Sequence, residues 1–347
     1  MSQIPTSIDD IDAAWMADAL GQPITAIHHE QIGEGIGVSS AVYRTSLTGG
    51  EVDSVVVKLP ALAEEAVFTS AVLRMYIREV RFFDSLASRS PIRVPKGYFG
   101  AVDVETSAFV QVMEDMGSMR VVDQNEGMTI DDAKQAIDEL ARWHAEWWGD
   151  ADAAVDRGDA VCLSDPVYPA VLPMVFAEGW EKVNAAMTVD PVITAVGPGW
   201  SDWMPGALAG LAGAPNTVIH GDYRADNILF DADGNVVLLD FQLTGRGSGS
   251  YDLAYFVTQS LRPEVAATHE TALFNRWIDG LVSAGVPEAE TVQLWDRYRE
   301  AALFCLVYPI VAARGMDLAD ERQYTLLDNM NTRFVRAVDQ LNLADLL

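Results

Sequence analysis

Residues 218–241 read VIHGDYRADNILFDADGNVVLLDF, and the organisation of the whole chain follows from this stretch. A polar loop, 220–227, precedes two short apolar segments that an Asp-Gly turn separates. Such a turn between two apolar runs predicts a β-hairpin. Because a hairpin holds its two ends close together, we expect Asp222, Asn227 and Asp240 to lie in one small space.

This grouping of oxygen ligands predicts a magnesium site. Two carboxylates and one carboxamide supply hard oxygen atoms, which suit Mg²⁺. Mg²⁺ seldom takes a complete protein cage and usually shares its coordination shell with phosphates and water. A carboxylate beside the metal ligands need not bind the ion itself and can accept a proton from a hydroxyl nucleophile. The alternative, a solvated polar loop, does not account for the ordered set of residues.

The spacing of these residues resembles the catalytic loop of kinases, in which an Asp, an Asn five positions later and an Asp after a hairpin recur. His-Gly-Asp, with Gly221 where protein kinases have Arg, is similar to the aminoglycoside phosphotransferase and choline kinase superfamily. Asp-Phe-Gln at 240–242 resembles its ecdysteroid-kinase-like branch. The resemblance implies ATP and Mg²⁺ as cofactors, Asp222 as catalytic base, and Asn227 and Asp240 as metal ligands.

The composition bounds the class of protein. The chain has 347 residues, half of them apolar, which is enough for two modest lobes. Its 51 acidic and 23 basic residues give a formal charge of −28, which disfavours nucleic acid and anionic lipid as partners. The same charge favours a cationic small molecule, although a generally acidic proteome would give the same balance. Cys162 and Cys305 are expected to be free thiols in a reducing compartment.

The ends and apolar runs of the sequence predict a soluble cytoplasmic protein. The first ten residues have neither a basic region nor an apolar core, so we expect no signal peptide. The longest uncharged apolar run, 301–313, is too short to span a bilayer, and Pro309 interrupts it. We therefore expect no membrane partner.

A glycine-rich segment lies between two strand-like segments near the N-terminus, 24–32 and 41–47. Gly33, Gly35 and Gly37 suit a loop whose backbone approaches a phosphate closely. Their spacing departs from Gly-x-Gly-x-x-Gly, so an ordinary glycine turn remains the alternative.

Lys58 lies on an apolar strand, 53–59, where a lysine is unfavourable unless it is paired. The next helix is expected to carry one apolar stripe made of Val72, Tyr76, Glu79, Phe83 and Leu86. A carboxylate on such a stripe needs a cation, and Lys58 is the expected partner of Glu79. The resemblance gives the same pair and implies that Lys58 binds phosphate; a lysine reaching to water is the alternative. Arg78 and Arg81 are alternative local partners of Glu79, although neither lies at the favoured i+3 or i+4 spacing. Glu64 and Glu65 are weaker candidates for the carboxylate that pairs with Lys58.

A strand expected over 107–113 runs into Glu114-Asp115-Met116. The resemblance implies that this strand end joins two lobes and that the backbone groups of Glu114 and Met116 hold adenine; an ordinary strand-to-loop turn is the alternative. On this basis a nucleotide-binding lobe covers 1–115, and a catalytic and acceptor-binding lobe covers 116–347.

The second lobe is expected to be mostly helical. Residues 130–148 predict a helix with His144 on its apolar face, where a core histidine is expected. Five prolines between 150 and 203 predict short helices and loops there. Asp252 is expected to be a helix N-cap. The resemblance, through Asp-Leu-Ala at 252–254, implies that Asp252 also supports the polar loop, and His220 is expected to order that loop.

These features lead to one expected function and two alternatives. The expected fold is α+β, a two-lobed protein-kinase-like fold with a small antiparallel-sheet lobe. The expected activity is ATP-dependent transfer of the γ-phosphoryl group to a hydroxyl of a small molecule. A nucleotide-binding pseudokinase or scaffold is one alternative. A protein kinase is the other, and Gly221 and the short segment 240–252 argue against it.

Overall fold

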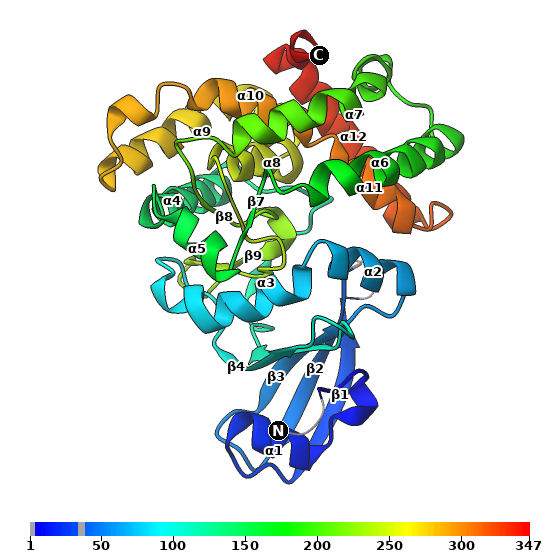
Figure 1. Ribbon diagram of the computed structural model, residues 1–347, viewed down its shortest axis with the longest axis vertical. Helices are drawn as coiled ribbons and strands as arrows, with labels where there is room; N and C mark the ends of the chain where they lie inside the picture. Colours follow the sequence, from blue (N-terminus) through cyan, green and yellow to red (C-terminus); the bar gives the residue numbers. More distant parts are fainter. Residues whose placement is uncertain (1–3, 34–38) are drawn as a thin grey trace. The chain divides into compact units, whose positions relative to one another are not determined.

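The computed structural model describes residues 4–33 and 39–347, which form two compact units (Figure 1). The N-terminal unit comprises the chain up to Met119 together with Leu239–Leu243. The C-terminal unit comprises Arg120–Leu238 and Thr244–Leu347. The first is built on a β-sheet and the second mostly on helices, so the expected α+β class is confirmed.

The N-terminal unit contains a five-stranded antiparallel sheet in the order β1-β2-β3-β5-β4. The strands are β1 (Ala26–Ile32), β2 (Ser40–Thr48), β3 (Ser54–Pro60), β4 (Gly97–Val102) and β5 (Phe109–Glu114). Central β3 carries Lys58, whose strand neighbours are Val42 and Gln111. Alternating β3 residues Val55 and Val57 are fully buried, as a central strand with one core face requires.

The helix expected around Glu79 is interrupted, so the prediction of one continuous stripe is wrong. Helix α2 (Glu64–Val72) ends at Leu73, and Arg74 has a left-handed backbone with φ of 56° before α3 (Met75–Arg81). A π-helical segment, Phe82–Leu86, then follows. A π turn holds more residues than an α turn, which changes the buried face. Phe82 is therefore fully buried and Phe83 only partly.

Helix α1 (Ala13–Leu20) precedes the sheet and contacts β4. The side chain of Asp12 caps it by accepting a hydrogen bond from the backbone N–H of Trp15 at 2.7 Å. A 3₁₀ turn at Ile8–Asp10 precedes this cap.

Nine α-helices make up most of the described C-terminal unit. They are α4 (Ile130–Glu146), α5 (Ala151–Arg157), α6 (Val167–Ala186), α7 (Pro191–Leu211), α8 (Ser250–Ser260), α9 (Pro263–Ser283), α10 (Leu294–Phe304), α11 (Val307–Gly315) and α12 (Glu321–Leu341). Thr129 caps α4, since its side chain accepts from the N–H of Asp132. Fully or almost fully buried tryptophans fill the core of this unit: Trp143, Trp147, Trp200 and Trp277.

The region 150–203 differs from the expectation of short helices and loops. Helix α6 contains Pro173 and α7 contains Pro198 and Pro205, yet both helices continue through these residues. A proline inside a helix leaves one carbonyl without its N–H partner. Pro198 and Pro205 lie on the exposed face of α7, where water can satisfy those carbonyls.

Two small sheets flank the polar loop, in the orders β10-β9-β6 and β7-β11-β8. Their strands are β6 (Arg120–Val121), β7 (Val161–Cys162), β8 (Thr217–Ile219), β9 (Ile228–Phe230), β10 (Val236–Leu238) and β11 (Gly245–Gly247). Strands β9 and β10 form the expected antiparallel hairpin. The Asp231 carboxylate accepts from the backbone N–H groups of Asp233 and Asn235, which fixes the turn.

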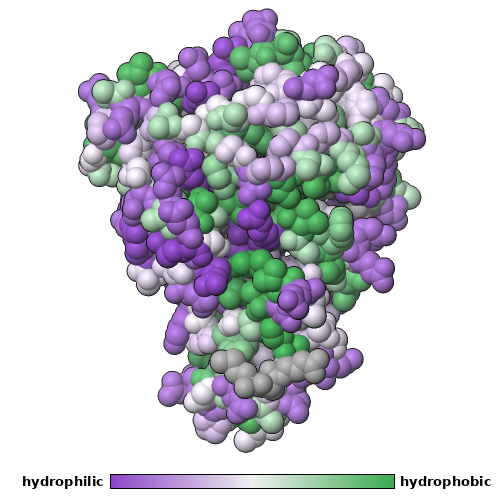
Figure 2. Space-filling view, in the orientation of Figure 1, coloured by the Kyte–Doolittle hydropathy of each residue, from purple (hydrophilic) through white to green (hydrophobic). Residues whose placement is uncertain are grey.

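The surface in Figure 2 shows hydrophilic residues spread over much of this face, with smaller apolar areas between them. Within the described part of the chain, no helix is long and apolar enough to cross a membrane. The apolar run 301–313 is divided between α10 and α11.

Candidate active site

The N-terminal unit brings three of the expected site residues together around one ammonium group. Lys58 Nζ lies 2.6 Å from Glu79 Oε1 and 3.4 Å from Asp240 Oδ1. Glu79 is 1% exposed and Lys58 9%, so this ion pair is buried. The pair expected between the strand lysine and the helix glutamate is present, although the helix is shorter than predicted.

Burial and charge act in opposite directions on this cluster. Burial disfavours the charge of Lys58, but the carboxylates of Asp240 and Glu79 outweigh it and raise the pKa of Lys58 to about 12. Burial raises the pKa of Glu79, and the nearby ammonium opposes that rise. One ammonium thus faces two carboxylates, which leaves negative charge available to a further cation.

Asp240 itself has a left-handed backbone, with φ of 63°. A residue with a Cβ atom pays about 1 kcal/mol or more for this conformation, so its neighbours must hold it there. The next two residues, Phe241 and Gln242, are 0% and 1% exposed. The carboxylate of Asp240 is 29% exposed and remains accessible to a ligand.

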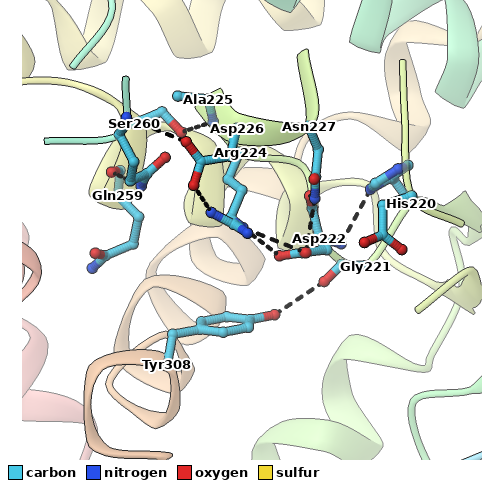
Figure 3. A network of polar contacts seen from close by, with 12 residues as sticks. His220, Gly221, Asp222, Arg224, Ala225, Asp226, Asn227, Gln259, Ser260 and Tyr308 are labelled. Carbon is cyan, nitrogen blue, oxygen red and sulfur yellow. Dashed lines mark hydrogen bonds and ion pairs between the residues drawn. The ribbon is translucent and has the colours of Figure 1, made fainter. Parts of the chain in front are cut away.

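The C-terminal unit brings Asp222 and Asn227 together (Figure 3). Asn227 Nδ2 donates to the backbone carbonyl of Asp222 at 2.9 Å and to its Oδ2 atom at 2.8 Å. Because the amide nitrogen faces Asp222, the amide oxygen of Asn227 faces away from it. The carboxylate of Asp222 is 18% exposed, so it is held by neighbours and still open to a substrate.

Arg224 is a site residue that the sequence reasoning missed. Its guanidinium lies between Asp222, at 3.3 Å from Oδ1, and Asp226 (Figure 3). Burial disfavours its charge, but Asp222 and other neighbours outweigh this and raise the pKa of Arg224. The alternation of opposite charges in Asp222-x-Arg224-x-Asp226 was the available signal.

The polar loop is anchored by a buried carboxylate. Asp252 accepts hydrogen bonds from the backbone N–H groups of His220 at 2.7 Å and Gly221 at 2.8 Å. The expectation that Asp252 caps α8 is wrong, because Gly249 occupies the N-cap and Asp252 lies within the first turn. Its carboxylate instead binds the two loop N–H groups, which confirms the support of the polar loop that the resemblance implied.

Two histidines support this arrangement. His144 Nε2 lies 3.1 Å from Asp252 Oδ2, and Nδ1 accepts from Trp277 Nε1, so His144 is the satisfied core histidine that was expected. His220 Nδ1 accepts from the N–H of Asp222 at 3.2 Å, which orders the loop. The hydroxyl of Tyr308 donates a further hydrogen bond to the loop, to the carbonyl of Gly221 at 3.1 Å (Figure 3).

The residues expected to hold adenine lie at the end of β5. The backbone N–H of Glu114 donates to the carbonyl of Lys96, and the carbonyl of Met116 accepts from the N–H of Met119. These contacts occupy the N–H of Glu114 and the carbonyl of Met116, two of the backbone groups at this strand end. The carboxylate of Glu114 is bound to Arg93 at 2.8 Å.

The glycine segment is described only at its start. Gly33 has φ of 71°, a conformation that favours glycine. The expected phosphate-binding positions Gly35 and Gly37 lie outside the described residues.

The oxygen donors present fit a hard cation such as Mg²⁺, because they are the carboxylate of Asp240 and the amide oxygen of Asn227. Among the described residues, no group of three or more His, Cys, Asp or Glu side chains is arranged to hold a metal. Asp240 belongs to the N-terminal unit and Asn227 to the C-terminal unit. Their convergence with Asp222 on one ion stays a prediction.

Comparison with known proteins identifies the sequence family. The family model described as the phosphotransferase enzyme family (APH) matches residues 30–300, most of the chain. No curated protein shows significant similarity to the sequence.

Solved structures show the same fold at low sequence identity. A Ralstonia eutropha protein assigned to the aminoglycoside phosphotransferases has a TM-score of 0.60 and 16% identity, covering 95% of this chain and 97% of that chain. Choline kinase from Cryptosporidium parvum has a TM-score of 0.54 and 12% identity, covering 90% and 88%. Amicoumacin kinase, solved with AMP-PNP and Ca²⁺, has a TM-score of 0.51 and 13% identity, covering 88% and 87%. The expected protein-kinase-like fold is thereby confirmed.

Proposed function

Because the chain belongs to the phosphotransferase enzyme family, we propose that it is a small-molecule kinase that uses ATP. In this proposal the γ-phosphoryl group of ATP is transferred to a hydroxyl of a small acceptor. The protein is proposed to act in the cytoplasm, without a nucleic-acid or membrane partner. Its charge of −28 supports this view of the partners and favours an acceptor of positive charge.

The observation that carries the proposal is the buried contact of Lys58 with both Glu79 and Asp240. A buried lysine between two carboxylates is costly to build and stays charged, as a phosphate ligand must. Glu79 orients the ammonium of Lys58. Asp240 is more exposed, so its carboxylate is accessible to a metal ion that would also bind the phosphates. The amicoumacin kinase structure, which contains AMP-PNP and Ca²⁺, supports a nucleotide and a divalent cation in this fold.

Asp240 and Asn227 would hold Mg²⁺, whose charge neutralises the phosphate oxygens when it is bound. Their donor atoms support this assignment, since one is a carboxylate and the other an amide whose oxygen faces away from Asp222. The backbone groups of Glu114 and Met116 would hold adenine. Gly33, Gly35 and Gly37 would lie against the phosphates.

Asp222 would accept the proton of the acceptor hydroxyl as that oxygen bonds to the γ-phosphorus and the bond from phosphorus to the β-phosphate oxygen breaks, with ADP as the leaving group. Asn227 and Arg224 hold its carboxylate by hydrogen bonds and charge, so its direction is fixed before the acceptor binds. Asp252 holds the backbone of His220 and Gly221, the two residues that precede Asp222. Phosphoryl transfer depends mainly on such positioning and on charge neutralisation, not on covalent chemistry by the protein.

The test is an ATP-consumption screen against a library of hydroxyl compounds. An acceptor should raise ATP turnover by the native chain, and Asp222→Asn should lower that turnover about 10²-fold to 10⁴-fold while nucleotide binding is retained. Asp233→Asn, in the exposed turn of the same hairpin, is the matched control and should leave turnover unchanged. Wild-type turnover in Asp222→Asn would remove Asp222 as the base. Nucleotide binding without turnover for any acceptor would favour the scaffold alternative.

A further inference from the structure

Three consecutive side chains, Asp240, Phe241 and Gln242, bind three different parts of the N-terminal unit. Asp240 contacts Lys58 on β3. Phe241 stacks on Phe82 with ring centroids 3.4 Å apart and an angle of 7° between the rings. Each of the three residues is therefore held by this unit, although the segment lies more than 100 residues after Met119, where the rest of the unit ends.

Gln242 makes the most specific of these contacts. Its Nε2 atom donates to Ser40 Oγ at 2.6 Å, and its Oε1 atom accepts from Ser39 Oγ at 2.6 Å. Both ends of the buried amide are thus satisfied by two adjacent hydroxyls at the start of β2. Leaving either end without a partner in this environment is unfavourable, so the bonds fix the position of residue 242 closely.

The position of Gln242 bears directly on the carboxylate of Asp240. The backbone N–H of Gln242 donates to Asp240 Oδ1 at 3.4 Å, the same atom that contacts Lys58. Asp240 is in a left-handed conformation that an unrestrained chain would leave. The hydroxyls of β2 on one side and Lys58 on the other therefore limit how far the carboxylate can turn.

The attachment of this segment does not depend on Gln242 alone. Ser39 also accepts a hydrogen bond on its carbonyl from Tyr76 at 2.9 Å, which ties the start of β2 to α3. Helix α3 in turn carries Glu79, the partner of Lys58. The contacts form a closed circuit from β2 through Gln242, Asp240, Lys58, Glu79 and Tyr76 back to β2.

We infer that Gln242 is a positioning residue that holds the Asp240 carboxylate in its metal-binding orientation before any nucleotide or metal is present. The inference rests on the proposed function, because it assigns Asp240 to the metal. A glycine at this position, as in Asp-Phe-Gly, has no side chain for the two serines. Gln242 thus holds residues 240–242 in one conformation within this unit, so that the Asp240 carboxylate does not move away from Lys58.

Gln242→Met is the informative change, because methionine has a similar length and no amide. Calorimetry with a non-hydrolysable ATP analogue should show that the Mg²⁺ concentration for half-maximal binding rises about tenfold, with metal-free nucleotide affinity within twofold of wild type. Ser40→Ala should give a smaller change in the same direction, and the double variant should match Gln242→Met alone. Wild-type Mg²⁺ dependence in Gln242→Met, or single effects that multiply in the double variant, would overturn the inference.

A second measurement needs no nucleotide. Amide hydrogen exchange followed by mass spectrometry should be faster in Gln242→Met for a peptide covering 238–244 and unchanged for peptides of α9 and α12, which report folding of the other unit. If the native chain binds no nucleotide, the proposed function fails, and this exchange experiment alone decides the role of Gln242. Unchanged exchange over 238–244 refutes that role.

Discussion

Replacing Glu79 by Gln tests the buried ion pair that the site is built on. The change keeps the size of the side chain and removes its charge. Lys58 then keeps Asp240 as its charged partner, 3.4 Å away instead of 2.6 Å and 29% exposed instead of almost fully buried. The carboxylate of Asp240 is thus a weaker partner, and it becomes the main counter-charge of the ammonium.

The structure sets the expected magnitude. Removing one charge of a buried pair lowers the free energy of unfolding by about 3 to 5 kcal/mol. Because the contact with Asp240 remains, we expect a loss of about 3 kcal/mol in this variant. Since each 1.4 kcal/mol is about tenfold in an equilibrium constant, local opening of β3 should become about 100-fold more frequent. Closer pairing of Lys58 with Asp240 should also weaken Mg²⁺-dependent nucleotide binding.

Amide hydrogen exchange of peptides from β3 and α3 measures this opening in the intact protein. Glu64→Gln is the matched control, because Glu64 is exposed on α2 and its change should stay within about 0.5 kcal/mol. Equal exchange rates in Glu79→Gln and the native chain would refute the claim that this pair stabilises the unit. If Glu64→Gln raised the exchange rates more than Glu79→Gln, Glu79 would not be the main partner of Lys58.

Two further predictions concern the C-terminal unit. In α7, a Cβ atom at Gly197 would lie 2.2 Å from the ring of Trp180, whereas one at Gly206 would meet nothing within 4 Å. Gly197→Ala should therefore lower the free energy of unfolding by about 1 to 3 kcal/mol, and Gly206→Ala should raise it by about 0.5 to 1 kcal/mol, as urea melts can measure; equal effects would contradict the packing. Burial raises the pKa of the Cys305 thiol, whereas Cys162 is half-buried, so a thiol reagent should label Cys162 in the native protein and both cysteines only after unfolding. Rapid native labelling of Cys305 would contradict its buried position.

Local sequence patterns predicted much of the site because its parts are close in the chain or carry strong signals. The hairpin after Asn227 follows from its Asp-Gly turn, and Lys58 and Glu79 each stand out as a charge on an apolar element. The spacing of Asp222, Asn227 and Asp240 resembles that of a known superfamily, and the family was confirmed.

Contacts that depend on tertiary structure were not predictable in this way. The two serines that bind Gln242 lie about 200 positions earlier in the sequence. The sequence around Asp252 wrongly predicted a helix cap, whereas its support of the polar loop followed only from the family resemblance, and the structure confirms that support.

Backbone conformation set a second limit on prediction. The left-handed residue Arg74 and the π turn that follows it have no clear signal in the sequence, so α2 and α3 were read as one helix. The prolines of α6 and α7 were taken as helix breaks because the sequence does not show which face of a helix water reaches.

The proposed site requires Asn227 and Asp240 to bind one divalent ion beside Asp222. A crystal structure with Mn²⁺ and a non-hydrolysable ATP analogue, with the ion located by its anomalous scattering, tests it directly. We predict oxygen atoms of Asn227 and Asp240 in the coordination shell at about 2.1 Å, as for Mg²⁺, with Asp222 facing the terminal phosphate. An ion bound elsewhere, with these three side chains on separate surfaces, would contradict the proposed site.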